Sequence, residues 1–250
     1  MFKRIVAAVI ALTILLCAVT ACGEVKKEYP IRTTLKYVDD SSEFLYYLLP
    51  DDEGYASYAA ITQWLLIEGS IAVPNKLTYE DGTEFPIKTV GLGYGVSSAP
   101  SELQIVTFGE GVTTIGNNAF TTCTELVKIL FPSTIETIGD NAFSCTAIVD
   151  LEIPASCKTI GESAFAACSK LSKLTISDGV KKIGSRAFAY CTAIEKLTIP
   201  ASVEEIEDGA FSFCIGLKQI DIPEKFASRI GDIFSGYRGE LGKDCEVNYY

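Results

Sequence analysis

The chain has 250 residues and no histidine, which excludes catalytic triads, zinc sites and general bases that depend on imidazole. Its first 21 residues contain Lys3, Arg4 and no acid, so the remainder holds 19 basic residues against 32 acidic ones, a formal charge of −13. Nucleic acids and anionic lipids bind proteins through an excess of Lys and Arg, so neither is expected as the main partner.

The start of the chain is typical of an exported protein. Residues 1–21 combine the basic pair with an apolar run over residues 5–19 and small residues before Cys22, as in a secretory signal. Residues 19–23 read VTACG and resemble the lipobox of bacterial lipoproteins, which implies that Cys22 carries the lipid and becomes the new N-terminus. An ordinary cleaved signal and an uncleaved anchor helix are the alternatives. Residues 22–30 are polar and are predicted to form a tether.

Residues 31–67 are predicted to form a β-hairpin cap. Two apolar-aromatic runs, Glu43 to Leu49 and Tyr55 to Ile61, flank the turn-forming sequence PDDEG. Such a hairpin would cover the open end of the repeats that follow. Its aromatic residues are expected to be buried under the cap, with a glycan-stacking platform as the alternative; they are Tyr46, Tyr47, Tyr55, Tyr58 and Trp64.

A degenerate first coil and five clear repeats come next. Residues 71–95 echo the repeat and contain an inserted hairpin around Asp81 and Gly82. The template L-x-x-L-x-I-P-x-x-V-x-x-I-G-x-x-A-F-x-x-C then recurs with a period of 23 residues over Leu103–Cys123, Leu126–Cys145, Ile148–Cys168, Leu171–Cys191 and Ile194–Cys214. A fixed period of this length is the signature of a solenoid, in which each unit buries its apolar face against its neighbours.

The predicted fold is a β-rich α/β solenoid of about six coils of 22–23 residues over residues 68–237, with a C-terminal cap or tail over residues 238–250. In each coil the L-x-x-L-x-I segment alternates as a strand and would stack into a parallel sheet. The recurring phenylalanine would fill the interior. The recurring glycines, numbered 116, 139, 161 and 184, are expected in a turn conformation closed to residues with a Cβ. Glu207 is an unexplained exception at that position.

The template resembles the BspA-type leucine-rich repeat family of bacterial surface and secreted proteins. The resemblance extends from about Ile71 to Phe234 and implies a curved solenoid that acts in binding or adhesion towards host or matrix components. It carries no catalytic residues over to this chain, and the family's ligand contacts form no transferable motif.

Five cysteines occupy one repeat position: Cys123, Cys145, Cys168, Cys191 and Cys214. Parallel side chains of neighbouring coils keep their Cβ atoms farther apart than a disulfide prefers, so a ladder of buried free thiols is favoured over bridges. No C-x-x-C spacing supports a metal site, and no cofactor is expected.

The acid pair Glu204-Glu205 could be imagined as glycosidase carboxylates. One coil away the equivalent positions hold Lys181-Lys182, so cross-strand ion pairs are the preferred explanation.

The outward residues of the strands are the candidate ligand-binding set. They are Ile105, Thr107, Lys128, Leu130, Asp150, Glu152, Lys173, Thr175, Lys196, Thr198, Gln219 and Asp221. Solenoids commonly present such a sheet to partners, although simple solvation of these side chains is the alternative for any one of them.

The sequence therefore predicts a protein without catalytic activity, anchored to the membrane by lipid on Cys22. It would bind a protein or glycan at the cell surface through a concave sheet, and it would not bind nucleic acid. A surface glycoside hydrolase or peptidase is the alternative from another class, and a structural display scaffold is the third.

Overall fold

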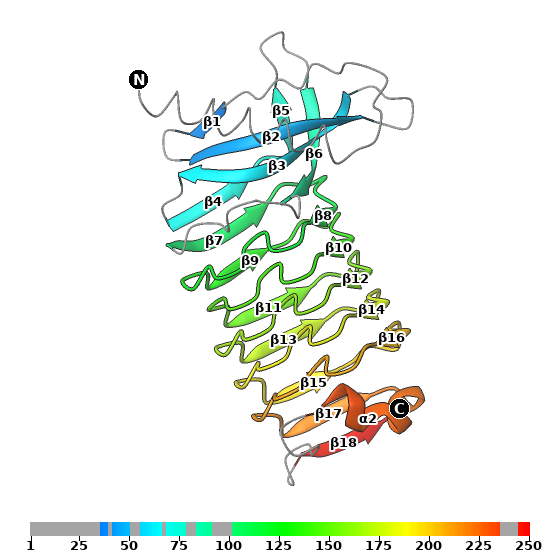
Figure 1. Ribbon diagram of the computed structural model, residues 1–250. Helices are drawn as coiled ribbons and strands as arrows, with labels where there is room; N and C mark the ends of the chain where they lie inside the picture. Colours follow the sequence, from blue (N-terminus) through cyan, green and yellow to red (C-terminus); the bar gives the residue numbers. More distant parts are fainter. Residues whose placement is uncertain are drawn as a thin grey trace, which may run out of the picture.

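The computed structural model describes residues 36–39, 42–50, 56–66, 69–78, 84–91, 102–235 and 245–250. Figure 1 shows an array of stacked coils with a layer of longer strands at its N-terminal end. The predicted signal, Cys22 and the tether lie outside the described residues. Among the residues that are described, no helix is both long enough and apolar enough to cross a membrane.

The predicted N-terminal hairpin is confirmed. Strands β2 (Ser42–Pro50) and β3 (Ala56–Leu66) pair antiparallel, and β1 (Lys36–Asp39) adds to β2. Strand β3 pairs in parallel with β6 (Glu84–Val90), so the hairpin continues a sheet of the solenoid. The burial expected of its aromatic side chains stays a prediction.

The inserted hairpin of the first coil is confirmed as well. Strand β5 (Lys76–Thr78) pairs antiparallel with β6, and Lys76 forms an ion pair with Glu84 across it. Strand β4 (Gly69–Val73) pairs in parallel with the first strand of the regular array, as a degenerate coil should.

Two lines of parallel strands run along the array (Figure 1). The first line holds the L-x-x-L-x-I strands, which are β7 (Leu103–Phe108), β9 (Lys128–Leu130), β11 (Asp150–Ile153), β13 (Lys173–Ile176), β15 (Lys196–Thr198) and β17 (Gln219–Ile222). The second line holds two-residue strands, which are β8 (Thr114–Ile115), β10 (Thr137–Ile138), β12 (Thr159–Ile160), β14 (Lys182–Ile183) and β16 (Glu205–Ile206).

The first line is not one continuous sheet. Its hydrogen-bonded groups are β4-β7-β9, β11-β13 and β15-β17-β18, whereas the second line runs unbroken from β6 to β16. The prediction of a single ladder on that side is therefore wrong at two places, between β9 and β11 and between β13 and β15.

A column of phenylalanine rings fills the interior. Phe120, Phe143, Phe165, Phe188 and Phe211 are at most 1% exposed, and consecutive rings stack in parallel with centroids 5.2–5.3 Å apart. Phe234 continues the column at 5.4 Å. The predicted interior role of the recurring phenylalanine is confirmed.

The recurring glycines are required because the backbones of adjacent coils approach closely at these positions. The expected turn conformation is therefore not the reason for them. None of the four has a positive φ. A Cβ on Gly161 would lie 2.5 Å from the Asp140 Oδ1 and 2.7 Å from the Gly139 carbonyl carbon, and one on Gly184 would lie 2.7 Å from the Gly161 carbonyl carbon. Adjacent coils touch through their backbones at these four glycines, so a Cβ added to one of them would push the coils apart. The left-handed conformation falls two residues later, as at Ser163 and Arg186.

Glu207 occupies the glycine position of its coil and makes polar contacts with the preceding coil. Its carboxylate accepts a hydrogen bond from the Ser185 amide at 2.8 Å and contacts the Lys182 ammonium at 2.5 Å. The side chain thus bonds to the preceding coil through polar atoms, where glycine would pack backbone against backbone.

The prediction of a buried thiol is wrong for one cysteine of the ladder, Cys145. Cys145 is exposed, while Thr146 is buried and its hydroxyl donates to the Phe143 carbonyl at 2.9 Å. The Thr146 hydroxyl also lies 3.2 Å from the Cys168 sulfur, so Thr146 takes the interior position next to the following thiol of the ladder. This coil is one residue shorter than its neighbours. Cys145 has the left-handed backbone of Thr122, so Thr146 corresponds to Cys123 and the missing residue lies after Thr146. The other four ladder thiols are buried and free, as predicted; they are Cys123, Cys168, Cys191 and Cys214.

The C-terminal end is closed by a 3-10 helix over Glu224–Arg229, the α-helix α2 (Ile230–Ile233) and a final strand. This strand, β18 (Glu246–Tyr249), pairs in parallel with β17 and so adds a strand to the first line. The predicted tail therefore contributes to the sheet.

Candidate functional site

The outward side of the first line of strands, from β7 to β17, is the candidate site and is called the strand face below. Alternation along each strand places Leu151, Leu174 and Leu197 inside and their neighbours outside. All twelve predicted residues lie on this outward side. Eight of them are exposed, and Ile105, Thr107, Gln219 and Asp221 are half-buried.

Ion pairs cross the strand face between neighbouring coils. The Lys173 ammonium lies 2.9 Å from an Asp150 carboxylate oxygen, and this hydrogen bond raises the pKa of Lys173. The Lys196 ammonium lies 3.7 Å from the Asp221 carboxylate. Hydrogen bonds from Gln219, followed by one from Asn248, lower the pKa of Asp221 and keep it ionised. The centre of the face therefore presents paired charges of both signs.

An open hollow of about 420 Å³ lies on the strand face between β13 and β15. It coincides with the second interruption of the sheet, where no backbone hydrogen bond joins the two strands. Predicted residues line it on both sides, namely Lys173, Lys196 and Thr198. Ser172 and Glu195, just before each strand, line it too and were missed, because the sequence gives no sign of the interruption.

An apolar patch lies at the N-terminal half of the strand face. Leu130, which was predicted, is 43% exposed, and Val127 and Val149 are 43% and 45% exposed. The two valines were missed, although they occupy one repeat position that later coils fill with Ser172 and Glu195. That change of residue type along the array is a signal the sequence does contain.

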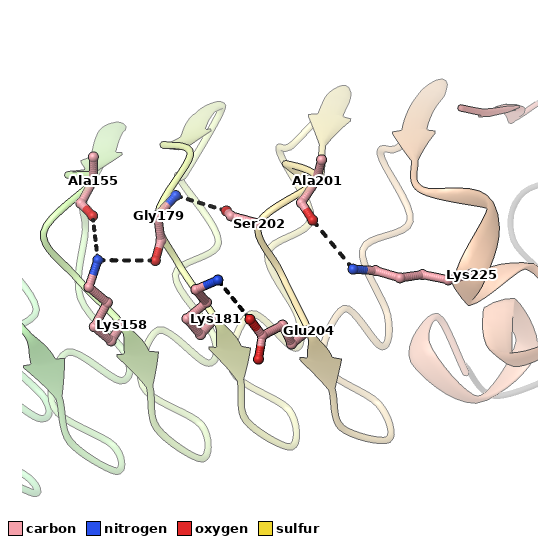
Figure 2. Close-up of polar contacts among 8 residues, drawn as sticks. All are labelled: Ala155, Lys158, Gly179, Lys181, Ala201, Ser202, Glu204 and Lys225. Carbon is pink, nitrogen blue, oxygen red and sulfur yellow. Dashed lines mark hydrogen bonds and ion pairs between the residues drawn. The ribbon is translucent and has the colours of Figure 1, made fainter.

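Glu204 and Glu205 form ion pairs away from the strand face. Lys181 lies 2.7 Å from Glu204 and Lys182 lies 3.3 Å from Glu205, as predicted from the spacing. Figure 2 shows the first pair.

Two further lysines of this region bind backbone carbonyl oxygens (Figure 2). The Lys158 ammonium donates to Ala155 and Gly179, and the Lys225 ammonium donates to Ala201. These side chains join neighbouring coils. Within the described part of the chain, no group of three or more Cys, Asp or Glu side chains is arranged to hold a metal ion.

A stacked array of coils with a polar, partly charged strand face defines a leucine-rich repeat solenoid, and comparison with known proteins agrees. The family described as BspA type leucine rich repeat region matches residues 97–218 and 181–238, with six copies. The chain belongs to this family. The search of curated proteins found no match.

Solved structures share the fold. The pneumococcal vaccine antigen PcpA is 22% identical with a TM-score of 0.60, and the match covers 77% of this chain and 50% of that one. This chain thus spans about half the length of the pneumococcal structure. The leucine rich repeat protein of T. pallidum, TpLRR, is also 22% identical with a TM-score of 0.52, and the match covers 82% of this chain and 78% of that one.

Proposed function

We propose that this protein is a non-catalytic binding protein of the bacterial cell surface, and that its strand face recognises a protein or glycan partner. The observation that carries the proposal is the open hollow between β13 and β15, which lies on the predicted face and is lined by Lys173, Lys196 and Thr198. Exposed apolar residues beside charges of both signs offer a partner both apolar contact and complementary charge.

The charges suit selective contact because they are exposed. The side chains of Lys173 and Asp150 are 69% and 57% exposed, so a partner can replace one member of the pair without stripping water from a buried charge. The N-terminal apolar patch would supply the desolvated contacts. Together these features favour a protein partner, with a glycan as the second possibility.

The alternative of a glycoside hydrolase or peptidase has less support. Glu204 and Glu205 are each held by a lysine, and the hollow contains one carboxylate, Glu195, which lies 2.7 Å from Lys218. Glycoside hydrolysis needs two carboxylates that flank one bond. A purely structural scaffold is the third candidate, and membership of a family of bacterial surface proteins favours the binding role over it.

Partner capture tests the proposed face. The purified chain from Ile31 onward is used to capture binding partners from matrix-protein and mucin preparations, and bound material is identified by mass spectrometry. The double variant Lys173→Glu with Lys196→Glu should lose at least roughly tenfold in capture, since it reverses two charges at the hollow. The control Lys170→Glu with Arg186→Glu reverses two exposed positive charges off the strand face. Equal capture by both double variants would refute the proposal.

We also propose that Cys22 carries lipid and anchors the chain outside the cytoplasm. The sequence around Cys22 and the membership of a family of surface proteins support this. Cells grown with a labelled fatty acid should label the full-length protein and leave the Cys22→Ala variant unlabelled. Label on the variant would contradict the anchor.

A further inference from the structure

A second surface feature lies in the A-F-x-x-C turn, away from the strand face. The residue two positions after each interior phenylalanine has a left-handed backbone, with φ of 59–61°. In chain order these residues are Thr122, Cys145, Ala167, Tyr190 and Phe213. A left-handed conformation disfavours bulky side chains, yet the last two coils carry aromatic rings there. Strained positions of this kind are often kept for function.

The two rings form an exposed stack. Tyr190 and Phe213 are parallel within 4°, with centroids 4.5 Å apart. This separation matches the spacing of about 4.8 Å between neighbouring strands, so the rings stack along the axis of the array. Phe213 covers one face of the Tyr190 ring. The other face is turned towards the coil of Ala167, whose methyl group is too small to cover it, and Tyr190 is 50% exposed.

Three hydroxyl groups lie in the turns that hold Tyr190 and Ala167. The backbone amide of Thr192 donates to the Tyr190 carbonyl, and that of Ser169 donates to the Ala167 carbonyl. These bonds keep Thr192 close to Tyr190 and Ser169 close to Ala167. In the part of the chain that the structure describes, the hydroxyls of Tyr190, Thr192 and Ser169 have no hydrogen-bond partner. Each can both donate and accept a hydrogen bond.

We propose that the open face of Tyr190 binds one ring of a neutral pyranose oligosaccharide. The C–H groups on the apolar side of a sugar ring pack on the electron-rich aromatic face, and the hydroxyls of Thr192 and Ser169 in these turns can exchange hydrogen bonds with sugar hydroxyls. The open face of Tyr190 is the area of one aromatic ring, far below the roughly 1,000 Å² that a stable protein interface needs. A sugar therefore fits it better than a protein partner does. This site is separate from the strand face and does not rest on the proposed function.

Calorimetric titration of the full chain in detergent tests the site, with cellohexaose, mannohexaose and galactohexaose as probes. At least one hexasaccharide should bind the unchanged chain. Tyr190→Ala should weaken that binding roughly tenfold, whereas Tyr190→Phe, which keeps the ring, should stay within about threefold. Ala167→Leu should weaken binding as Tyr190→Ala does, because the larger side chain covers the ring.

Two controls separate the explanations. Tyr249→Ala removes an exposed tyrosine elsewhere and should change nothing. The double variant Lys173→Glu with Lys196→Glu should also bind normally, so the site can fail or succeed independently of the strand face. No binding of any of the three hexasaccharides, equal binding by Tyr190→Ala, or loss on Tyr190→Phe would each overturn the proposal.

Discussion

Phe165→Ala should be among the most destabilising single changes in the array. Its ring is fully buried and stacks on Phe143 and on Phe188, with 5.3 Å between centroids on each side. Truncating a buried phenylalanine costs about 3–5 kcal/mol through lost transfer energy and the cavity left behind. Two aromatic contacts of about 0.5–1.5 kcal/mol each disappear with it, which places the expected loss near the upper end, at about 4–5 kcal/mol.

Urea denaturation measures this loss. Circular dichroism and tyrosine fluorescence should be followed together, because a repeat array can unfold in parts and a single free energy is defined only where both probes coincide. Phe213→Ala is the matched control, since Phe213 is half-buried and stacks on one ring at the surface. It should cost less than about 1.5 kcal/mol. A loss below about 2 kcal/mol for Phe165→Ala, or one equal to that of the control, would refute the account of the interior column.

Three further predictions concern other contacts of the array. Gly161→Ala should destabilise by more than about 2 kcal/mol because its Cβ would meet the preceding backbone, whereas Gly231→Ala, with nothing within 4 Å, should be neutral or slightly stabilising in the same urea titration. Lys181 and Lys182 lower the pKa of Glu204 and Glu207 in the folded state. The stability from these pairs is present above the ordinary glutamate pKa of about 4.3 and is lost as pH falls through the lowered pKa of the folded state. Lys181→Met with Lys182→Met should therefore reduce the loss of stability between pH 7 and pH 3. An unchanged loss would count against these ion pairs. Under native conditions iodoacetamide should label Cys145 much faster than Cys123 or Cys214, whose burial raises the pKa of each thiol to about 12, and equal rates by peptide mapping would contradict the assignment.

The repeat period and the alternation of apolar residues were enough to predict the solenoid, the direction of each strand side chain and the phenylalanine column. These features follow from local rules that every coil repeats. The ion pairs of Lys181 and Lys182 with Glu204 and Glu205 followed from the same period, because in-register coils bring equivalent positions together.

Features that depend on how one coil differs from the next were harder to predict. The short coil can be aligned with its missing residue on either side of Cys145, and only the backbone shows that Thr146 takes the buried place. The sequence alone does not explain the recurring glycines, because a close approach between coils and a left-handed turn both favour a residue without a Cβ. The structure shows that close approach is the cause. The hollow on the strand face lies where the pairing between β13 and β15 is interrupted. No residue in Leu171–Cys191 predicts this interruption.

The central claim is that a partner binds the strand face, and site-directed photo-crosslinking tests it most directly. A photoreactive amino acid is placed at Thr175, which is exposed on β13, and in a second protein at Lys170, which is exposed in the turn before that strand. Each protein is irradiated with a captured partner and the products are mapped by mass spectrometry. The account predicts partner crosslinks from position 175 and few from position 170. Crosslinks of equal yield at both positions, or from position 170 alone, would contradict it.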